Sequence, residues 1–169
     1  MVSGLFGFIL GRVSASLGRR EKRQQSARLI IHDAQPIVES IRHNRDTFRQ
    51  ANQSGNQKVR AYFQMTLEVF PSDDGQEFQL QCRQAVDFSD RIVADLRKAG
   101  TDVVKLEKRH NAIREGLEYN IDWQSVREAY LHLLEDTLAS VSDGVKALRR
   151  TVPRESRPLV DAIVKAGDR

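Results

Sequence analysis

The sequence predicts an all-α protein, a mostly antiparallel bundle of four to six helices that begins with a glycine-rich apolar helix. Apolar residues recur at intervals of three and four through most of the chain, and no stretch shows the alternation of a half-buried strand. Glycine, proline and short polar runs separate these periodic segments. Because short connections join antiparallel neighbours, the pattern indicates a bundle.

Composition and charge favour one globular domain with a basic start. The 169 residues are enough to bury a sizeable core, and 40% are apolar while 30% are charged. Residues 1–50 contain nine Lys and Arg against four Asp and Glu, whereas the rest of the chain is close to neutral. The positive charge therefore belongs to the N-terminal region, and nucleic acid is disfavoured as a partner of the body. We divide the chain into residues 1–18, 19–151 and 152–169.

Small residues recur at heptad spacing in the first 18 residues, so on a helix they form one stripe. The stripe consists of Gly4, Gly7, Gly11, Ser14 and Gly18. The opposite side carries Phe6, Ile9, Leu10, Val13 and Leu17. Each glycine costs an ordinary helix about 0.5–1 kcal/mol relative to alanine. The stripe is therefore typical of close helix–helix packing, which occurs in membranes and in protein contacts.

A basic run follows at residues 19–28. It contains Arg19, Arg20, Lys22, Arg23 and Arg28. Such a run is attracted to an anionic cytoplasmic leaflet by about 1 kcal/mol per charge. Spanning a bilayer takes about 20 apolar residues, and Arg12 divides this short segment. We therefore expect the segment to lie in the membrane interface, or to insert when several copies assemble.

Three other interpretations of residues 1–18 remain open. A secretory signal fits the apolar core but lacks a positive start, and Arg12 falls late. An organellar transit peptide fits the arginines, serines and missing acids of residues 1–20. The third alternative is a helix that packs on the body or on a neighbouring subunit.

The first helix of the body extends over residues 20–51. Its apolar seam is Ile30, Ala34, Ile37, Ile41, Asn44 and Phe48. Pro36 predicts a kink, or a break near Asp33–Gln35. We expect Asn44 at a wet end of the bundle, although a buried asparagine would select a partner. A turn at 52–56 and a short helix at 59–70 follow.

The third helix begins at Asp74 after a turn. We expect its inner face to comprise Phe78, Cys82, Ala85, Val86, Ile92, Val93 and Leu96. Gly100 is expected to end it and Thr101 to cap the next helix. Cys82, the chain's one cysteine, excludes a disulfide framework and a cysteine zinc site, and we expect its thiol to be buried.

Two further long helices and a short one complete the chain. The fourth helix carries Val103, Leu106, His110, Ile113 and Leu117 on its inner face. The fifth begins near Asp122 and carries Trp123, Val126, Tyr130, Leu133, Leu134, Leu138, Val141, Val145 and Leu148. One continuous helix over 101–151 is an alternative, but the capping residues near 120–122 favour a break. Pro153 stops the fifth helix, and residues 156–164 predict a terminal helix that packs or frays.

No catalytic motif is present, so we expect a non-enzymatic protein without catalytic residues or cofactors. Glu107 and His110 form a Glu-x-x-His, half of a di-iron motif whose second half is missing. We therefore expect no metal, and a hydrogen-bonded His110 at the core edge. Glu39 with His43, and Glu128 with His132, predict surface ion pairs.

Taken together, the patterns favour a self-assembling helical protein whose N-terminal segment engages or permeabilises a membrane. In organisation only, it is similar to membrane-permeabilising bundle effectors, with no residue correspondence. We expect a homo-oligomer in the cytoplasm, peripheral to or inserted in the inner face of an anionic membrane. The alternative is a soluble assembly or adaptor protein whose N-terminal helix contacts a protein partner or another subunit.

Overall fold

The chain forms the expected all-α helical bundle. The computed structural model describes residues 3–50, 74–115 and 123–168, with side chains for 17–49, 75–113 and 125–168. This part contains α1 (Ser3–Gln50), α3 (Asp74–Gln84), α4 (Asp90–Glu115), α5 (Trp123–Leu148), the short 3-10 helix η3 (Arg154–Ser156) and α6 (Arg157–Gly167), and no strand. The helix expected at 59–70 lies outside the described residues.

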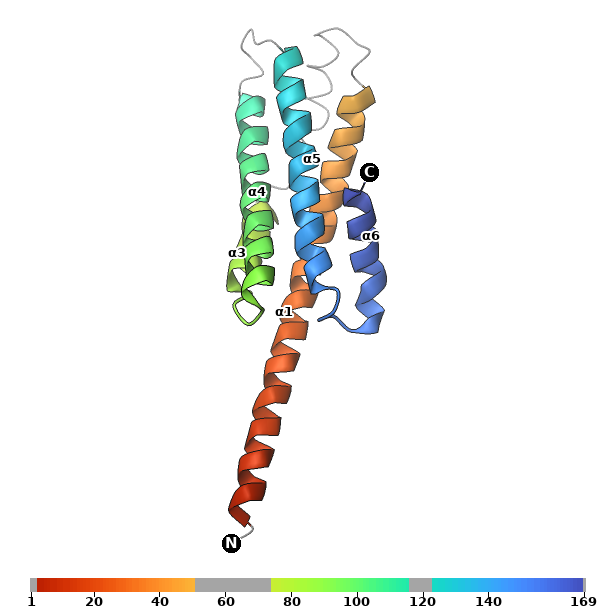
Figure 1. The fold of residues 1–169 in the computed structure, drawn as a ribbon. Helices are drawn as coiled ribbons and strands as arrows, with labels where there is room; N and C mark the ends of the chain where they lie inside the picture. The colour runs from red at the N-terminus through yellow and green to blue at the C-terminus, as the bar shows by residue number, and fades with distance from the viewer. Residues whose placement is uncertain (1–2, 51–73, 116–122, 169) are drawn as a thin grey trace.

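Successive helices from α3 to α6 alternate in direction, and α1 runs antiparallel to α5 (Figure 1). α5 packs against α1, α4 and α6, while α3 packs against α1 and α4. Since α4 and α5 are separate helices that lie side by side, the alternative of one continuous helix over 101–151 is wrong. The terminal helix α6 packs on the bundle through Val160, Ile163 and Ala166.

The apolar seam of α1 forms one side of the core. Its buried residues begin at Ala27 and continue through Ile30, Ile31, Ala34, Ile37, Val38 and Ile41 to Phe48. Facing them are Phe78 and Cys82 of α3, Leu96, Val103 and Leu106 of α4, and Tyr130, Leu134, Leu138 and Val141 of α5. The expected burial of Cys82 is confirmed, and desolvation raises the pKa of its thiol to about 12.

α1 continues through Pro36, so the expected break near Asp33–Gln35 is wrong. Proline removes the hydrogen bond to the carbonyl of the residue four positions before it, here His32. Both Pro36 and His32 are exposed, so water can solvate that carbonyl. Because Ile37 and Val38 beside the proline are buried, packing holds the two halves of the helix in register.

The break expected at Gly100 and Thr101 is also wrong, because α4 runs through both residues. A Cβ on Gly100 would lie 3.0 Å from the Cα of Gln79 and 3.3 Å from the Cβ of Cys82. This glycine therefore permits close approach of α3 to α4. The Thr101 hydroxyl donates to the carbonyl of Arg97 at 2.8 Å inside the helix.

The actual break is the turn between α3 and α4. Ser89 accepts the first helical hydrogen bond of α4 from the amide of Val93 at 3.0 Å, so Ser89 occupies the N-cap position. Val86, which was expected on the inner face, lies in this turn and is 66% exposed. Ile92 and Val93 are only partly buried, because they follow the turn instead of continuing α3.

Asn44 is fully buried, so its expected position at a wet end of the bundle is wrong. It lies in the part of α1 that packs against α5, near Tyr130, whose pKa is raised by burial. Tyr130 also packs edge-on against Phe48, with ring centroids 5.4 Å apart. The asparagine therefore lies within the contact between α1 and α5, where its side-chain amide makes no hydrogen bond to the described residues.

The close approach at Gly100 gives the first testable prediction. Gly100→Val should lower the free energy of unfolding by about 1–3 kcal/mol, because its methyl groups would overlap the α3 backbone. The matched control is Gly18→Val, where an added Cβ meets no atom within 4 Å. Urea denaturation followed by circular dichroism measures both. Equal midpoints for the two variants would contradict the close packing of α3 on α4.

Candidate functional site

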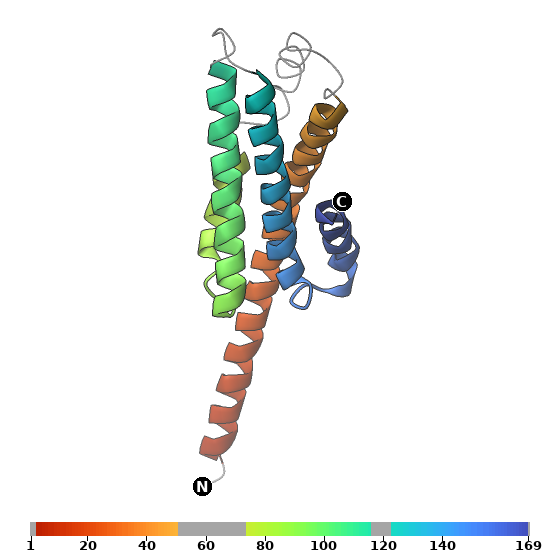
Figure 2. The same ribbon diagram turned by 45° about the horizontal axis from the view of Figure 1, so that its top comes forward.

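The N-terminal part of α1 projects beyond the other helices (Figures 1 and 2). The helix runs without interruption from Ser3 across position 18 into the bundle. From Ser3 to Gly18 an α-helix rises about 24 Å. At its base, Leu17 is 53% exposed. None of the described helices is long and apolar enough to cross a membrane.

The side chains expected to contact lipid are described only in part. Leu17 is exposed, and the side chains of Phe6, Ile9, Leu10 and Val13 lie outside the described set. The same holds for the residues of the small stripe that precede Gly18. Around Gly18 itself there is open space, so its position can accept a close neighbour.

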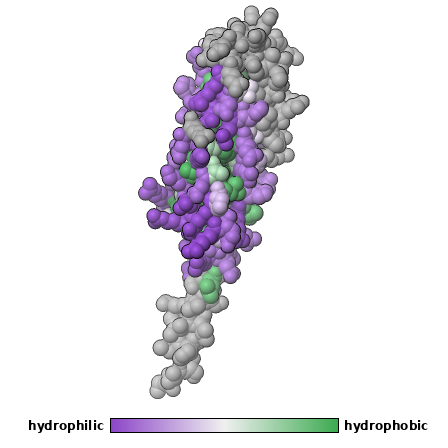
Figure 3. Space-filling view, turned by 90° about the vertical axis from the view of Figure 1, so that its right-hand side faces the viewer, coloured by the Kyte–Doolittle hydropathy of each residue, from purple (hydrophilic) through white to green (hydrophobic). Residues whose placement is uncertain are grey.

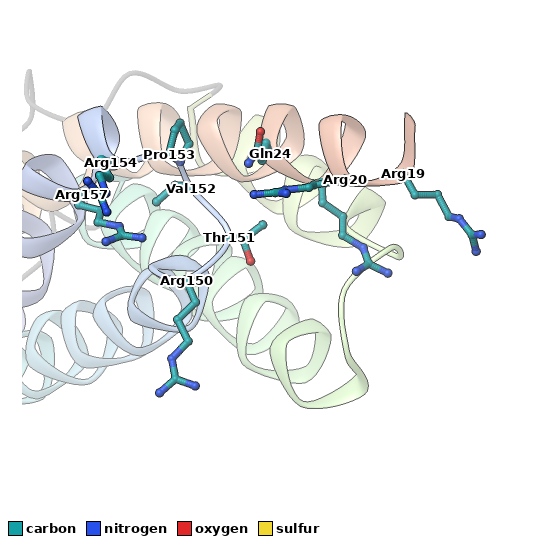
Figure 4. Close-up of a pocket in the computed structure, with 10 residues that line it drawn as sticks. Arg19, Arg20, Gln24, Arg150, Thr151, Val152, Pro153, Arg154 and Arg157 are labelled. Atoms are coloured by element: carbon teal, nitrogen blue, oxygen red, sulfur yellow. The ribbon is translucent and has the colours of Figure 1, made fainter. Parts of the chain in front are cut away.

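A basic groove lies where α1 enters the bundle. It has a volume of about 620 Å³ and lies between α1 and the connection from α5 to α6 (Figure 4). Six of its lining residues are arginines: Arg19, Arg20 and Arg23 from α1, and Arg150, Arg154 and Arg157 from the connection and the start of α6. Gln24, Thr151, Val152 and Pro153 complete the lining. We call this feature the arginine groove.

Local hydrogen bonds fix the α5–α6 connection, which forms the far wall of the groove, opposite α1. The amides of Thr151 and Val152 donate to the carbonyl of Leu148, at 2.8 and 3.2 Å, and close the end of α5. Val152 is buried and anchors the connection to the core. Pro153 is extended, with φ −64° and ψ 163°, and leads the chain into η3. The arginines on either side of this anchor thereby line the groove on the side opposite α1.

Contacts between the end of α5 and α6 also hold the connection between these helices in place. The Arg149 guanidinium donates to both carboxylate oxygens of Asp161, at 2.7 and 3.1 Å. These hydrogen bonds lower the pKa of Asp161. Farther along α6, a Cβ on Gly167 would lie 2.5 Å from the Cβ of Ser142. The glycine therefore permits the end of α6 to pack closely on α5.

The groove carries positive charge without acidic partners in its lining. Within the described part of the chain, Arg20, Arg23, Arg150, Arg154 and Arg157 form no ion pair with a carboxylate. The Nε atom of Arg157 is buried and makes no hydrogen bond there. Arg19, Arg20, Arg23, Arg150 and Arg154 are exposed. A shallow surface with several uncompensated guanidinium groups has the chemistry to bind anions, above all phosphates.

The structure brings together only part of the predicted basic run. Arg19, Arg20 and Arg23 line the groove, although the Arg19 side chain points away from it (Figure 4), whereas Lys22 and Arg28 are exposed elsewhere on α1. The arginines at 150, 154 and 157 were missed by sequence reasoning. The sequence contains a signal for them, since four arginines fall within residues 149–157. What the sequence does not show is that this second cluster lies beside the first.

The Glu-x-x-His pair does not form a shared site. His110 is buried and its Nδ1 lies 2.7 Å from the Tyr130 hydroxyl, which confirms the expected hydrogen-bonded histidine. Glu107 turns toward the start of α3, where a Cβ on Gly75 would lie 2.6 Å from its Oε2. A carboxylate at a helix N-terminus is stabilising. Among the described residues, no group of His, Cys, Asp and Glu could hold a metal ion.

The two surface ion pairs expected from i,i+4 spacing are wrong. Glu39 instead accepts a hydrogen bond from Gln35 Nε2 at 2.9 Å. Glu128 and His132 are both exposed and form no ion pair within the described residues. At exposed sites such pairs contribute little, so water competes successfully for these charges.

The described surface has no broad apolar patch on the side where α6 lies. Figure 3 views this side, and its coloured surface is mainly hydrophilic with small apolar areas. The large exposed apolar residues are Leu17, Leu29, Leu80 and Val86. Scattered residues of this kind are ordinary on a protein surface. Charge, and not apolar area, therefore distinguishes the described surface.

Comparisons with protein families, with curated proteins and with solved structures find no match to this chain. A function must therefore be argued from the chemistry of the site itself.

The Arg149–Asp161 pair predicts a pH-dependent contribution to stability. Because the folded-state pKa of Asp161 lies below its ordinary value of 3.8, the pair stabilises the fold above that value and loses this effect as the pH falls. Asp161→Asn should therefore lower the melting temperature slightly at pH 7, and its difference from wild type should shrink as the pH falls below the ordinary pKa of 3.8. Thermal melts between pH 2.5 and 7 measure this.

The control for this experiment is Asp136→Asn on α5, since Asp136 is exposed and forms no ion pair in the described residues. A pH-independent effect of Asp161→Asn would contradict the role of the pair.

Proposed function

We propose that this protein is a non-enzymatic helical-bundle protein that docks end-on onto an anionic membrane. The N-terminal segment of α1 enters the interface, and the arginine groove at the same end of the bundle contacts the lipid headgroups. The observation that carries the proposal is the common location of the projecting helix and the six arginines.

The direction of α1 supports this orientation. The helix leaves the bundle at the end where α5 connects to α6, and the arginines of that connection lie beside it (Figures 1 and 4). If the tip of α1 enters a membrane, the groove reaches the headgroup layer. Arg20 extends from α1 on the side of the Thr151–Pro153 connection. Anionic lipids then neutralise charge that the protein leaves uncompensated.

The length of residues 3–18 supports a segment that inserts into the membrane but does not cross it when only one copy is present. A helical rise of about 24 Å for residues 3–18 is less than the roughly 30 Å of a bilayer's hydrocarbon core. Arg12 would cost at least about 2.5–3.5 kcal/mol at mid-bilayer. A single copy would therefore keep Arg12 near the headgroups, or several copies would place it around a wet lumen.

The docking proposal predicts loss of membrane binding when residues 1–18 are removed or when the arginines that follow them are changed. Residues 19–169 retain every buried residue of the described core, since the first is Ala27, so this truncation should fold. It should fail to float with anionic vesicles. Arg19→Gln, Arg20→Gln and Arg23→Gln together should weaken partitioning by about 3 kcal/mol, roughly 100-fold. Flotation on phosphatidylcholine vesicles with and without phosphatidylserine measures both.

The charge-matched control replaces Arg97, Lys98 and Arg109, three exposed cations of α4, with glutamine. This control should bind vesicles like the wild type. Equal losses of vesicle binding for the two triple variants would show that net charge, and not the position of the arginines, controls binding. Flotation of the truncated protein would show that residues 1–18 are not needed for membrane binding.

Self-assembly of the inserted helices is the second part of the proposal. The stripe of Gly4, Gly7, Gly11, Ser14 and Gly18 would let neighbouring helices pack closely, while Arg12 faces away from hydrocarbon. Permeabilisation would follow from several copies in contact.

The stripe predicts a specific loss of permeabilisation. Gly7→Leu with Gly11→Leu should reduce dye release from anionic vesicles by an order of magnitude or more, because bulky side chains hold the helices apart. Far-UV circular dichroism should show unchanged helicity of the body. Ser16→Leu, which adds the same bulk on the opposite side of the helix, serves as the control. Unchanged leakage by the double variant would overturn the close-packing argument.

The alternative function is an assembly or adaptor protein whose projecting helix contacts a partner or another subunit. The exposed Leu17 at the base of the projecting helix supports a protein contact as much as it supports membrane docking. In that case neither the intact protein nor the truncation would float on vesicles of either composition. The truncation would instead change the oligomeric state in analytical ultracentrifugation.

A further inference from the structure

We infer that the arginine groove is a specific site for a ligand with two or more clustered phosphate monoesters, such as a multiply phosphorylated lipid headgroup. This inference deepens the proposed membrane docking and rests on it for the source of the ligand. General attraction to an anionic surface needs only the basic run of α1. The groove adds a second wall, made by Arg150, Arg154 and Arg157.

The arrangement of the arginines distinguishes the groove from a charged helix face. Two segments that are more than a hundred residues apart in the sequence contribute three arginines each. A flat surface of monovalent lipids could satisfy one wall, whereas a ligand that contacts both walls must present several negative groups in a small volume. The groove volume of about 620 Å³ is typical of sites for small molecules.

Phosphate monoesters match the charge and geometry of this site best. Each carries about −1.5 to −2 charges at pH 7 and three acceptor oxygens. Two such phosphates therefore balance three or four guanidinium groups. Arginine donates in a planar fork that fits phosphate oxygens in pairs. The N-terminus of α6, at Arg157 of the groove, adds a favourable helix dipole for anions.

Residues around the groove disfavour a nucleic acid. The described lining contains no aromatic side chain, so bases have no surface on which to stack. Its neutral polar groups are Gln24 and Thr151, and the buried Val152 with Pro153 forms a small apolar floor. The nearest acids in sequence, Glu21 and Glu155, are exposed and lie outside the lining. Such a site recognises phosphate groups, not bases.

The test uses the full chain and two probes. Isothermal titration calorimetry measures inositol 1,4,5-trisphosphate, the soluble form of a clustered-phosphate headgroup. Flotation compares vesicles that contain phosphatidylinositol 4,5-bisphosphate with phosphatidylserine vesicles of the same total charge. The variant is Arg150→Gln with Arg154→Gln, which removes two arginines of the far wall. Arg97→Gln with Lys98→Gln on α4 removes the same charge elsewhere.

We expect the wild type to bind inositol trisphosphate with a stoichiometry of one, and to prefer the bisphosphate vesicles. The far-wall variant should bind the trisphosphate about 10- to 100-fold more weakly, since each charge-assisted hydrogen bond contributes strongly. It should lose the lipid preference yet still float on phosphatidylserine vesicles. The α4 variant should behave like the wild type. Circular dichroism melts check that all variants are folded.

The outcomes separate this inference from the proposed function. Flotation on both vesicle types without trisphosphate binding or lipid preference would overturn the groove site and leave the membrane proposal standing. Trisphosphate binding through Arg150 and Arg154, without flotation on any vesicle, would support the groove as a site for a soluble polyphosphate. An oligonucleotide that binds as tightly, with the same dependence on these two arginines, would overturn selectivity for clustered monoesters.

Discussion

The structure depends on the packing of the apolar face of α1, from Ala27 to Phe48, against α3, α5 and α6. Each fully buried aliphatic side chain on this face contributes about 1.5–3 kcal/mol, so the second half of α1 is held firmly. Because the helix is continuous back to Ser3, that packing also sets the direction in which residues 3–18 leave the bundle. The core therefore positions a segment that takes no part in it.

A polar contact inside the bundle fixes the register of three helices. Tyr130 of α5 is hydrogen-bonded to His110 of α4 and packs edge-on against Phe48 of α1. Apolar side chains alone could slide past each other by a turn, but a buried hydroxyl without its partners would cost about 1–3 kcal/mol. The register of α1 against α5 in turn determines which arginines of α1 meet the end of α5.

The sequence was sufficient for the bundle, the buried faces and the hydrogen-bonded His110, because these follow from local periodicity. It misled at Pro36 and Gly100, where proline and glycine usually mark helix ends. At Pro36 the lost hydrogen bond falls on the solvent side, and at Gly100 the missing Cβ admits α3; both reasons lie in packing. Only the α1 side of the arginine groove could be predicted from the sequence, because Arg150 and Arg154 come near the basic run only in the tertiary structure.

The positive charge concentrated in the arginine groove is unfavourable for folding when no anion is bound. Exposed guanidinium groups within a Debye length of about 8–10 Å repel each other, and the described carboxylates leave most of those in the groove unpaired. An anion that binds both walls removes this repulsion and links α1 to the α5–α6 connection. Binding to the folded state alone then stabilises the fold. The end of the bundle that carries the arginine groove is thus expected to be its least stable end when unbound, and to be stabilised by the anions that bind there.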